Sequence, residues 1–232
     1  MRAAVIASSI ASGARIAAEV EKIAGVEVFV VLCNAGMRPP ITRWMREVAL
    51  LLKSLGGWSP GKLWRDRRAG KLLVLRQTLD DPQSTELIRS LRCDVGLHAA
   101  NVIYREPTIS AFRLGILNAH IGVLPQYRGR SVAEWSVLQG DATGVTVFFI
   151  DSGIDTGERI VVRELVPRAG CDSVSKLKRR LFARDAISYR KAIEALMSPG
   201  FRTEKNDTSK GLRYFVMSKL LTQAVTGILR AE

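Results

Sequence analysis

Short apolar runs alternate along the chain with longer amphipathic runs, a pattern typical of proteins in which strands and helices alternate. β-branched apolar runs predict strands, and apolar residues at helical spacing predict helices. The expected strands are 3–7, 26–33, 71–75, 94–99, 115–118, 146–150 and 159–165, and the expected helices are 14–23, 41–55, 82–91, 106–112 and 173–196. The alternation predicts an α/β fold with a Rossmann-like, open, twisted and mostly parallel sheet, with helices on both faces.

Turn residues set the expected boundaries of this fold. Pro199 and Gly200 follow the last long helix, so we expect one domain over 1–197 and a C-terminal tail over 198–232. Residues 57–70 carry Gly, Pro and several arginines without an apolar stripe, which predicts a loop. The amphipathic run 41–55 is basic; core packing with a solvated basic face, a membrane surface and a docking face are its three interpretations.

The composition, 47% apolar and 25% charged residues over 232 positions, is that of a soluble globular protein. We expect no transmembrane segment, since the apolar runs are short, and we interpret the apolar N-terminus as a core strand rather than a signal peptide. Three widely separated cysteines, Cys33, Cys93 and Cys171, indicate buried thiols in a reducing cytoplasm. With only His98 and His120 as histidine ligands, we expect no metal site.

The net charge of +13 is unevenly distributed along the chain. Residues 38–76 and 163–232 each carry a net charge of +8, whereas 77–162 carry −3. Such basic flanks could hold a phosphorylated substrate, a nucleic acid or an anionic surface, or they could be solvated faces.

Three side chains between 117 and 160 have the chemistry needed to move an acyl group onto an amine. Asn118 and His120 end an apolar run, and residues two apart on extended backbone face the same way. Together they could hold the oxygen of a carbonyl that is turning into a tetrahedral oxyanion. Asp155, in a Gly-Ile-Asp-Thr-Gly turn, is the best carboxylate partner for the histidine, and Asp151 is a second carboxylate.

Small residues after the first strand form a second candidate site. Ser8, Ser9, Ser12 and Gly13 precede or begin a helix and could offer backbone N–H groups to a phosphate of the substrate. The segment is neither a P-loop nor a complete dinucleotide-binding fingerprint, so the pattern alone is a weak indication of a phosphate site.

The span 100–165 resembles the formyltransferases that use 10-formyltetrahydrofolate, which include methionyl-tRNA, glycinamide-ribonucleotide and sugar-nucleotide N-formyltransferases. The resemblance rests on motifs that occur in the order of the family: Gly115…Asn118-x-His120, Leu124-Pro125, Tyr127-Arg128-Gly129, Trp135, Thr143-Gly144-Val145-Thr146 and Asp151…Asp155-Thr156-Gly157. It implies the formyltransferase fold, a cytoplasmic enzyme and 10-formyltetrahydrofolate as the co-substrate.

The resemblance also assigns roles to individual residues. It implies that Asn118, His120 and Asp155 form the catalytic triad and that the pterin is cradled by two segments. These segments are Asn101, Val102, Ile103 and Tyr104 on one side, and Asp151, Gly153 and Ile154 on the other. Tyr127 and Arg128 are candidates for substrate contacts.

Departures from the family pattern limit the choice of acceptor. Ile121-Gly122 follows the histidine where the family often has Pro or Gly then Ser, and Phe148 stands where some purine-pathway members have a second histidine. Residues 38–70 look like an insertion or a replaced segment, and the sequence does not include the C-terminal barrel of methionyl-tRNA formyltransferases.

We therefore expect an N-formyltransferase that acts on a small primary amine, first of all an amino sugar on a nucleotide carrier. A methionyl-tRNA formyltransferase-like enzyme with tRNA as its partner is the alternative, motivated by the basic flanks. A non-catalytic binding or membrane-associated protein on this scaffold is a third hypothesis, and a homodimer is a candidate assembly.

Overall fold

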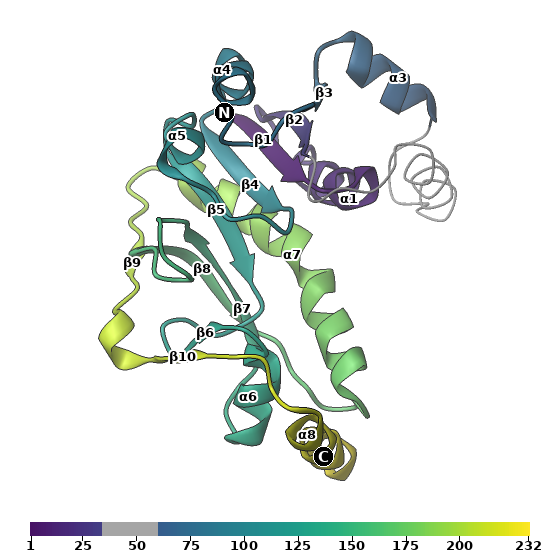
Figure 1. Cartoon of the computed structure of the whole chain (residues 1–232), viewed down its shortest axis with the longest axis vertical. Coiled ribbons are helices and arrows are strands. Elements are labelled where there is room, and N and C mark those ends of the chain that lie inside the picture. The colour runs from purple at the N-terminus through teal and green to yellow at the C-terminus, as the bar shows by residue number, and fades with distance from the viewer. Residues whose placement is uncertain (34–59) are drawn as a thin grey trace. The chain divides into compact units, whose positions relative to one another are not determined.

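The computed structural model describes residues 1–33 and 60–232, which fall into two compact units, Met1–Leu117 and Asn118–Glu232 (Figure 1). The helix expected over 41–55 lies outside the described residues, as do 57–59 of the expected loop. The boundary between the two units differs from the expected division at 197/198.

The first unit is built on parallel strands. The strands are β1 (Arg2–Ala7), β2 (Glu27–Leu32), β3 (Leu72–Val74), β4 (Val95–Ala99) and the beginning of β5 (Gly115–His120). Their order is β3-β2-β1-β4-β5, and every pairing in this unit is parallel. The expected strands of this half are confirmed within one or two residues at each end, and β1 is indeed a buried core strand.

Helices cover both faces of this parallel sheet. Gly13 in α1 (Ile10–Val20) is so close to the sheet that an added Cβ would lie 3.2 Å from the Cβ of Ala7. On β4, an added Cβ at Gly96 would lie 3.1 Å from Phe112, just after α5 (Glu106–Ile109), and Gly96 pairs with Ala4. Side chains alternate along a strand, so Ala4 and Ala7 point to opposite faces. The helix predicted over 82–91 is also present, as α4 (Pro82–Ser90).

The loop predicted over 57–70 is wrong for most of its length, because α3 spans Pro60–Arg68. Ion pairs help to hold this helix: the Lys62 ammonium lies 2.9 Å from Asp66 on the next turn and 3.0 Å from Glu21, the C-cap residue of α1. Gly70, with φ of 71°, ends the helix in the left-handed conformation that glycine adopts without strain. A reading based on hydrophobic periodicity cannot detect such a helix.

The second unit continues β5 and adds five further strands. These are β6 (Tyr127–Gly129), β7 (Gly144–Phe149), β8 (Arg159–Leu165), β9 (Glu204–Lys205) and β10 (Leu212–Tyr214). β8 pairs antiparallel with both β7 and β9, whereas β6 and β10 form a separate parallel pair. The predicted mostly parallel α/β sheet is confirmed, and β6, β9 and β10 are additions that the sequence pattern did not predict.

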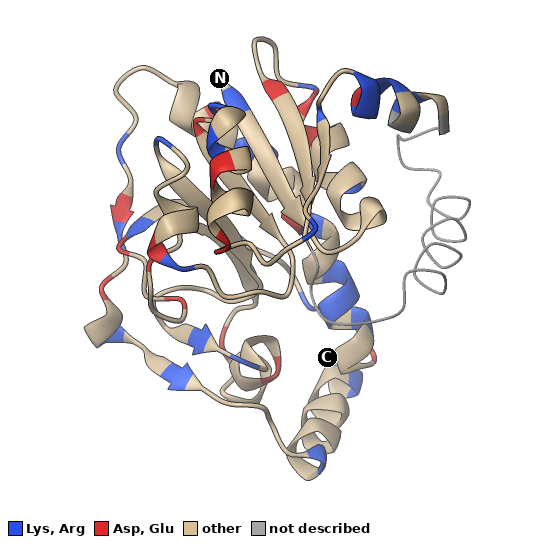
Figure 2. Ribbon diagram, turned by 45° about the horizontal axis from the view of Figure 1, so that its top comes forward, with Lys and Arg blue, Asp and Glu red and all other residues tan. Residues whose placement is uncertain are grey.

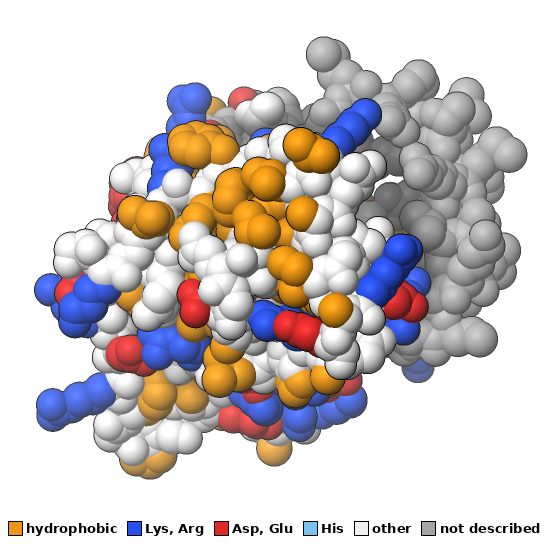
Figure 3. All heavy atoms as spheres, turned by 90° about the horizontal axis from the view of Figure 1, so that it is seen from below, with side chains coloured by type: hydrophobic (Ala, Val, Ile, Leu, Met, Phe, Trp, Pro, Cys, Tyr) orange, Lys and Arg blue, Asp and Glu red, His pale blue; other side chains and the backbone are white. Residues whose placement is uncertain are grey.

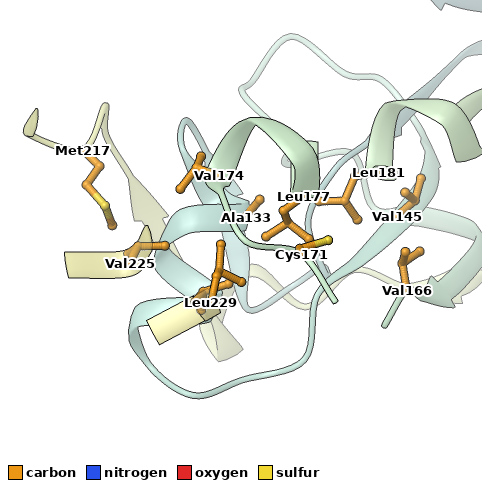
Figure 4. Close-up of a cluster of buried hydrophobic side chains, with 11 residues drawn as sticks. Ala133, Val145, Val166, Cys171, Val174, Leu177, Leu181, Met217, Val225 and Leu229 are labelled. Atoms are coloured by element: carbon orange, nitrogen blue, oxygen red, sulfur yellow. The ribbon is translucent and has the colours of Figure 1, made fainter. Parts of the chain in front are cut away.

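The segment 198–232, expected as a tail, is part of the core of this second unit. Its helix α8 (Lys219–Ala231) packs against α6 (Val132–Leu138) and α7 (Val174–Met197). Val225 and Leu229 of α8 join Leu177 and Leu181 of α7 in one buried cluster (Figure 4). The segment also carries the 3₁₀ turn Thr208–Lys210.

Two surface features of the second unit bear on the basic flank. Figure 2 marks several Lys and Arg positions along the α7 ribbon. Two of the α7 lysines are paired with carboxylates: Lys178 lies 2.5 Å from Glu134, and Lys191 pairs with Glu164. Apolar side chains gather on the face shown in Figure 3. In the segment that runs from β10 to α8, the large exposed apolar residues are Leu212, Phe215, Val216 and Leu220. Within 1–33 and 60–232, no helix is both long and apolar enough to span a bilayer.

Candidate active site

Asn118 and His120 lie at the carboxyl end of β5, separated by Ala119. The N–H of Ala119 donates to the buried Tyr189 hydroxyl of α7 at 2.9 Å, which holds the strand where ladder pairing ends. The Asn118 side chain is half-buried, and its amide forms no hydrogen bond with the residues that the structure describes. An amide group that can donate therefore stands two residues before the histidine, on the same side of the strand.

The His120 imidazole is buried, and both of its ring nitrogens face oxygen atoms of the protein. Its Nε2 lies 2.8 Å from the backbone oxygen of Tyr127, and its Nδ1 lies 3.5 Å from Oδ1 of Asp155. A carbonyl oxygen can only accept, so Nε2 carries the hydrogen, and the neutral ring keeps its lone pair on Nδ1. When Nδ1 takes a proton, the neighbouring carboxylate stabilises the imidazolium.

Asp155 adopts a backbone conformation that is unusual for a residue with a side chain. Its φ is 53°, in the left-handed region that costs about 1–3 kcal/mol and persists only where the surroundings enforce it. Its Oδ2 accepts the N–H of Gly129 at 2.9 Å, which leaves Oδ1 for His120. The carboxylate is therefore aimed at the histidine by contacts on both of its oxygens.

The turn that carries Asp155 is also stabilised from within. Oδ1 of Asp151 accepts the N–H of Gly153 at 2.9 Å and the hydroxyl of Thr156 at 2.7 Å. Ile154, between them, exposes 45% of its surface. Asp151 and Gly153 thus present an apolar side chain on an ordered loop.

The His120 ring packs directly against Gly122, where a side chain would not fit. An added Cβ at Gly122 would lie 2.6 Å from Nε2 of His120 and 2.9 Å from the backbone oxygen of Tyr127. The hydroxyl of Thr146 donates to the Gly122 oxygen at 2.7 Å and accepts from the N–H of Leu124 at 3.1 Å. The departure from the family pattern at Ile121-Gly122 is therefore compatible with the site, because it provides the space that the ring occupies.

The two predicted substrate contacts have structural partners in the second unit. The Tyr127 hydroxyl lies 2.7 Å from Oε1 of Gln139 and 2.5 Å from Oδ2 of Asp141, and its one hydrogen can be donated to either acceptor. Burial and the nearby Asp141 carboxylate raise the pKa of Tyr127. The Arg128 guanidinium donates to the backbone oxygens of Thr208 and Gly211, at 3.2 and 3.1 Å. Both side chains hold the chain around the site, and their contact with substrate stays a prediction.

The remaining predicted residues lie in the first unit. Ser9 is the N-cap of α1, where its hydroxyl oxygen accepts the N–H of Ser12 at 3.2 Å, and Gly13 is packed against the sheet. The N–H of Ser8 donates to Ala99 at the end of β4, at 3.4 Å, so this segment lies beside the one that follows β4.

That following segment is Asn101–Tyr104. Ile103 exposes 80% of its surface, whereas Tyr104 is buried and its hydroxyl lies 2.8 Å from Nδ1 of His98. Asn101 and Val102 precede them in the same connection. The predicted phosphate segment and the 101–104 segment thus both follow strands of the first unit, at the carboxyl edge where ligands bind in this class of fold.

Sequence reasoning missed two residues that support the triad, Tyr189 and Asn206. The Asn206 amide donates to the backbone oxygens of Asp155 and Gly157, at 3.3 and 3.0 Å. Neither residue belongs to a motif, since Tyr189 lies within a long helix and Asn206 within a polar stretch. In the described ranges, no cluster of three His, Cys, Asp or Glu side chains is suited to bind a metal ion.

Curated relatives match the part of the chain that contains this site. The chain is 37% identical over 122 residues to the methionyl-tRNA formyltransferase of Parabacteroides distasonis, which covers 52% of this chain and 37% of that protein. It is 32% identical over 158 residues to the methionyl-tRNA formyltransferase of Roseiflexus castenholzii, covering 67% and 49%. The chain therefore spans between about a third and a half of the length of such relatives.

Solved structures share the fold over nearly the whole chain. A sugar N-formyltransferase from Shewanella sp. superposes with a TM-score of 0.65 at 14% identity, covering 99% of this chain and 87% of that one. A glycinamide ribonucleotide transformylase from Symbiobacterium toebii gives 0.61 at 23% identity, covering 89% and 94%. Residues 66–193, more than half of the chain, match the Formyl transferase family, and the chain belongs to that family.

Proposed function

We propose that this protein transfers a formyl group from 10-formyltetrahydrofolate to a primary amine. The observation that carries the proposal is the arrangement around His120, whose ring is held between the Tyr127 carbonyl and the Asp155 carboxylate. Beside it stands the Asn118 amide, which has no partner among the described residues. A positioned base and a donor that is available for an oxyanion are the parts that acyl transfer requires.

Each side chain has a defined task in this reaction. A bond forms between the amine nitrogen and the formyl carbon, and the Asn118 N–H stabilises the negative charge that develops on the formyl oxygen. Nδ1 of His120 takes the proton that the attacking amine loses, while Asp155 stabilises the imidazolium. His120 then returns this proton to N10 of the folate as the bond between N10 and the formyl carbon breaks, so the histidine ends as it began.

Each of the two predicted pterin segments offers groups that would suit the donor. A pterin is a flat ring with a polar edge, which suits apolar side chains and backbone hydrogen-bonding groups on ordered loops. The 151–157 turn offers the exposed Ile154 on a loop that Asp151 stabilises, and the connection after β4 offers the exposed Ile103. When bound, 10-formyltetrahydrofolate supplies an activated formyl group.

An amino sugar on a nucleotide carrier is the acceptor that we place first. In support, the chain is similar over 100% of its length to the formyltransferase PseJ from Anoxybacillus kamchatkensis, at 16% identity and a TM-score of 0.55. That structure contains tetrahydrofolate and a UDP-linked formamido sugar. The basic charge of the flanks would suit the phosphates of such a carrier.

Methionyl-tRNA is the second candidate acceptor. The curated relatives named above are methionyl-tRNA formyltransferases, and residues 163–232 carry a net charge of +8. Phosphate contacts would make tRNA binding fall steeply with salt.

We place the reaction in the cytoplasm, because the three cysteines, all in the described ranges, are buried and form no disulfide.

The test is to incubate the protein with 10-formyltetrahydrofolate and a panel of amines, and to measure released tetrahydrofolate and formylated product. The panel contains amino-sugar nucleotides, the same sugars without a nucleotide, and methionyl-tRNA. His120→Asn and Asn118→Ala should each lower turnover by roughly 100-fold or more, whereas Gln223→Ala, on the exposed side of α8, should not. Absence of turnover on every amine would contradict the proposal, and folate binding without turnover would favour a binding protein on this scaffold.

A further inference from the structure

We propose that Asn206 is a positioning residue for Asp155, and that it makes the C-terminal segment a part of the reaction centre. This inference rests on the proposed formyl transfer, because it assigns the placement of the carboxylate that assists His120. Asn206 is 2% exposed and directly follows β9. Along the chain it is distant from every motif described above.

The strand register brings Asn206 to the turn that carries Asp155. β9 pairs antiparallel with β8, with Lys205 opposite Arg159, and the N–H of Asn206 donates to the Glu158 oxygen at 2.8 Å. The backbone of Asn206 is therefore fixed beside the 155–157 turn before its side chain makes any contact.

The side chain then holds both ends of that turn. Its Nδ2 donates to the backbone oxygen of Asp155 at 3.3 Å and to that of Gly157 at 3.0 Å. Gly157 also packs against the end of β7, so closely that an added Cβ would lie 1.7 Å from the backbone oxygen of Phe149. The turn is thus clamped between the end of β7 and the Asn206 amide.

Asp155 requires such a clamp because of its backbone. A left-handed conformation costs energy at a residue with a Cβ, less at Asp than at most residues, and neighbouring contacts help to hold it in place. Relaxation would rotate the carboxylate away from His120 Nδ1 and from the N–H of Gly129, the two groups that its oxygens now meet. Asn206 restrains the backbone, whereas Gly129 restrains only the side chain.

The geometry is specific to an amide at this position. Both acceptors are backbone oxygens, so the side chain must donate twice from one nitrogen, as an amide can. Oδ1 of Asn206 is buried and has no partner within the described ranges, so the side chain acts through its two donated hydrogen bonds.

A double-mutant cycle tests this role through the catalytic rate. In the wild-type background, Asn206→Ala should lower kcat by roughly 10- to 100-fold and change the KM for 10-formyltetrahydrofolate by less than about threefold. In an Asp155→Asn background, where no carboxylate remains to be placed, the same change should alter single-turnover rates by less than about threefold. Lys205→Ala, an exposed neighbour in β9, is the matched control and should leave kcat unchanged.

If Asn206→Ala does not fold, Asn206→Ser carries the cycle, since a hydroxyl can still donate to one of the two oxygens. In that variant kcat should fall in the wild-type background and stay nearly unchanged in the Asp155→Asn background. An equal loss in both backgrounds, or no loss in either, would overturn the proposal. Failure of the wild type to transfer formyl to any amine would instead count against the proposed function.

A second readout needs no turnover. The chain has two histidines, so nitrogen-15 spectra of labelled protein report His120 with His98 as an internal control. Wild-type His120 should show the tautomer protonated on Nε2, and Asn206→Ala should shift its Nδ1 resonance because the carboxylate has moved. Unchanged His120 resonances in the folded variant would refute the positioning role even if formyl transfer is never observed.

Discussion

Gly122 offers a sharp test of the site, because replacing it with alanine adds one methyl group directly beneath the His120 ring. The new Cβ would lie 2.6 Å from Nε2, whereas an ordinary contact begins at 3.4 Å, so the ring must move by about 0.8 Å. Gly122 is not among the glycines with positive φ, so an alanine backbone is allowed and the effect is steric alone. Displacement of about 1 Å in an active site can cost roughly 100-fold in rate, or about 2.7 kcal/mol.

The same substitution should also lower stability. Overpacking typically costs about 1–3 kcal/mol, and loss of the Nε2 bond to the Tyr127 carbonyl costs about 1 kcal/mol more. The assay is kcat/KM for formyl transfer at a temperature where circular dichroism shows the variant folded, beside urea unfolding. Gly227→Ala is the matched control, since nothing lies within 4 Å of its added Cβ and an alanine in α8 should stabilise by about 0.5–1 kcal/mol. A folded Gly122→Ala protein with kcat/KM within about threefold of wild type would refute the assigned ring position.

Two further substitutions test the surroundings of the site. Tyr189→Phe removes the acceptor of the Ala119 N–H and should cost about 1–3 kcal/mol in urea unfolding and about tenfold in kcat; an unchanged kcat would show that β5 needs no such anchor. Burial raises the pKa of Glu164, but hydrogen bonds from Lys191 and Ser188 outweigh it and lower the pKa overall. The ionised Glu164 should therefore stabilise the fold at pH 7, where Glu164→Gln should lower the free energy of unfolding by about 1–3 kcal/mol. This difference should shrink as the pH drops below about 4.3. A difference between the two proteins that is constant with pH would contradict the lowered pKa.

The sequence was sufficient for those features that depend on local pattern. Periodicity predicted the parallel strands and α7 because each buries apolar residues at the spacing of its own backbone. The same rule put Asn118 and His120 on one side of β5. Hydrophobic periodicity failed to predict α3, which Lys62 stabilises through ion pairs. It also failed for β9 and β10, which are too short to show a period.

The triad shows where local pattern ends and tertiary structure begins. The bonds of Asp151 to Gly153 and Thr156 span two and five residues, so a reading of the turn motif can anticipate them. The direction of the Asp155 carboxylate depends instead on Gly129 and Asn206, which are 26 and 51 residues away. Because the left-handed φ of Asp155 is stable only when such distant contacts enforce it, the sequence could identify the reacting groups but not the support that aligns them. Variants at Asn206 therefore probe whether this centre is assembled by the whole second unit rather than by its motif alone.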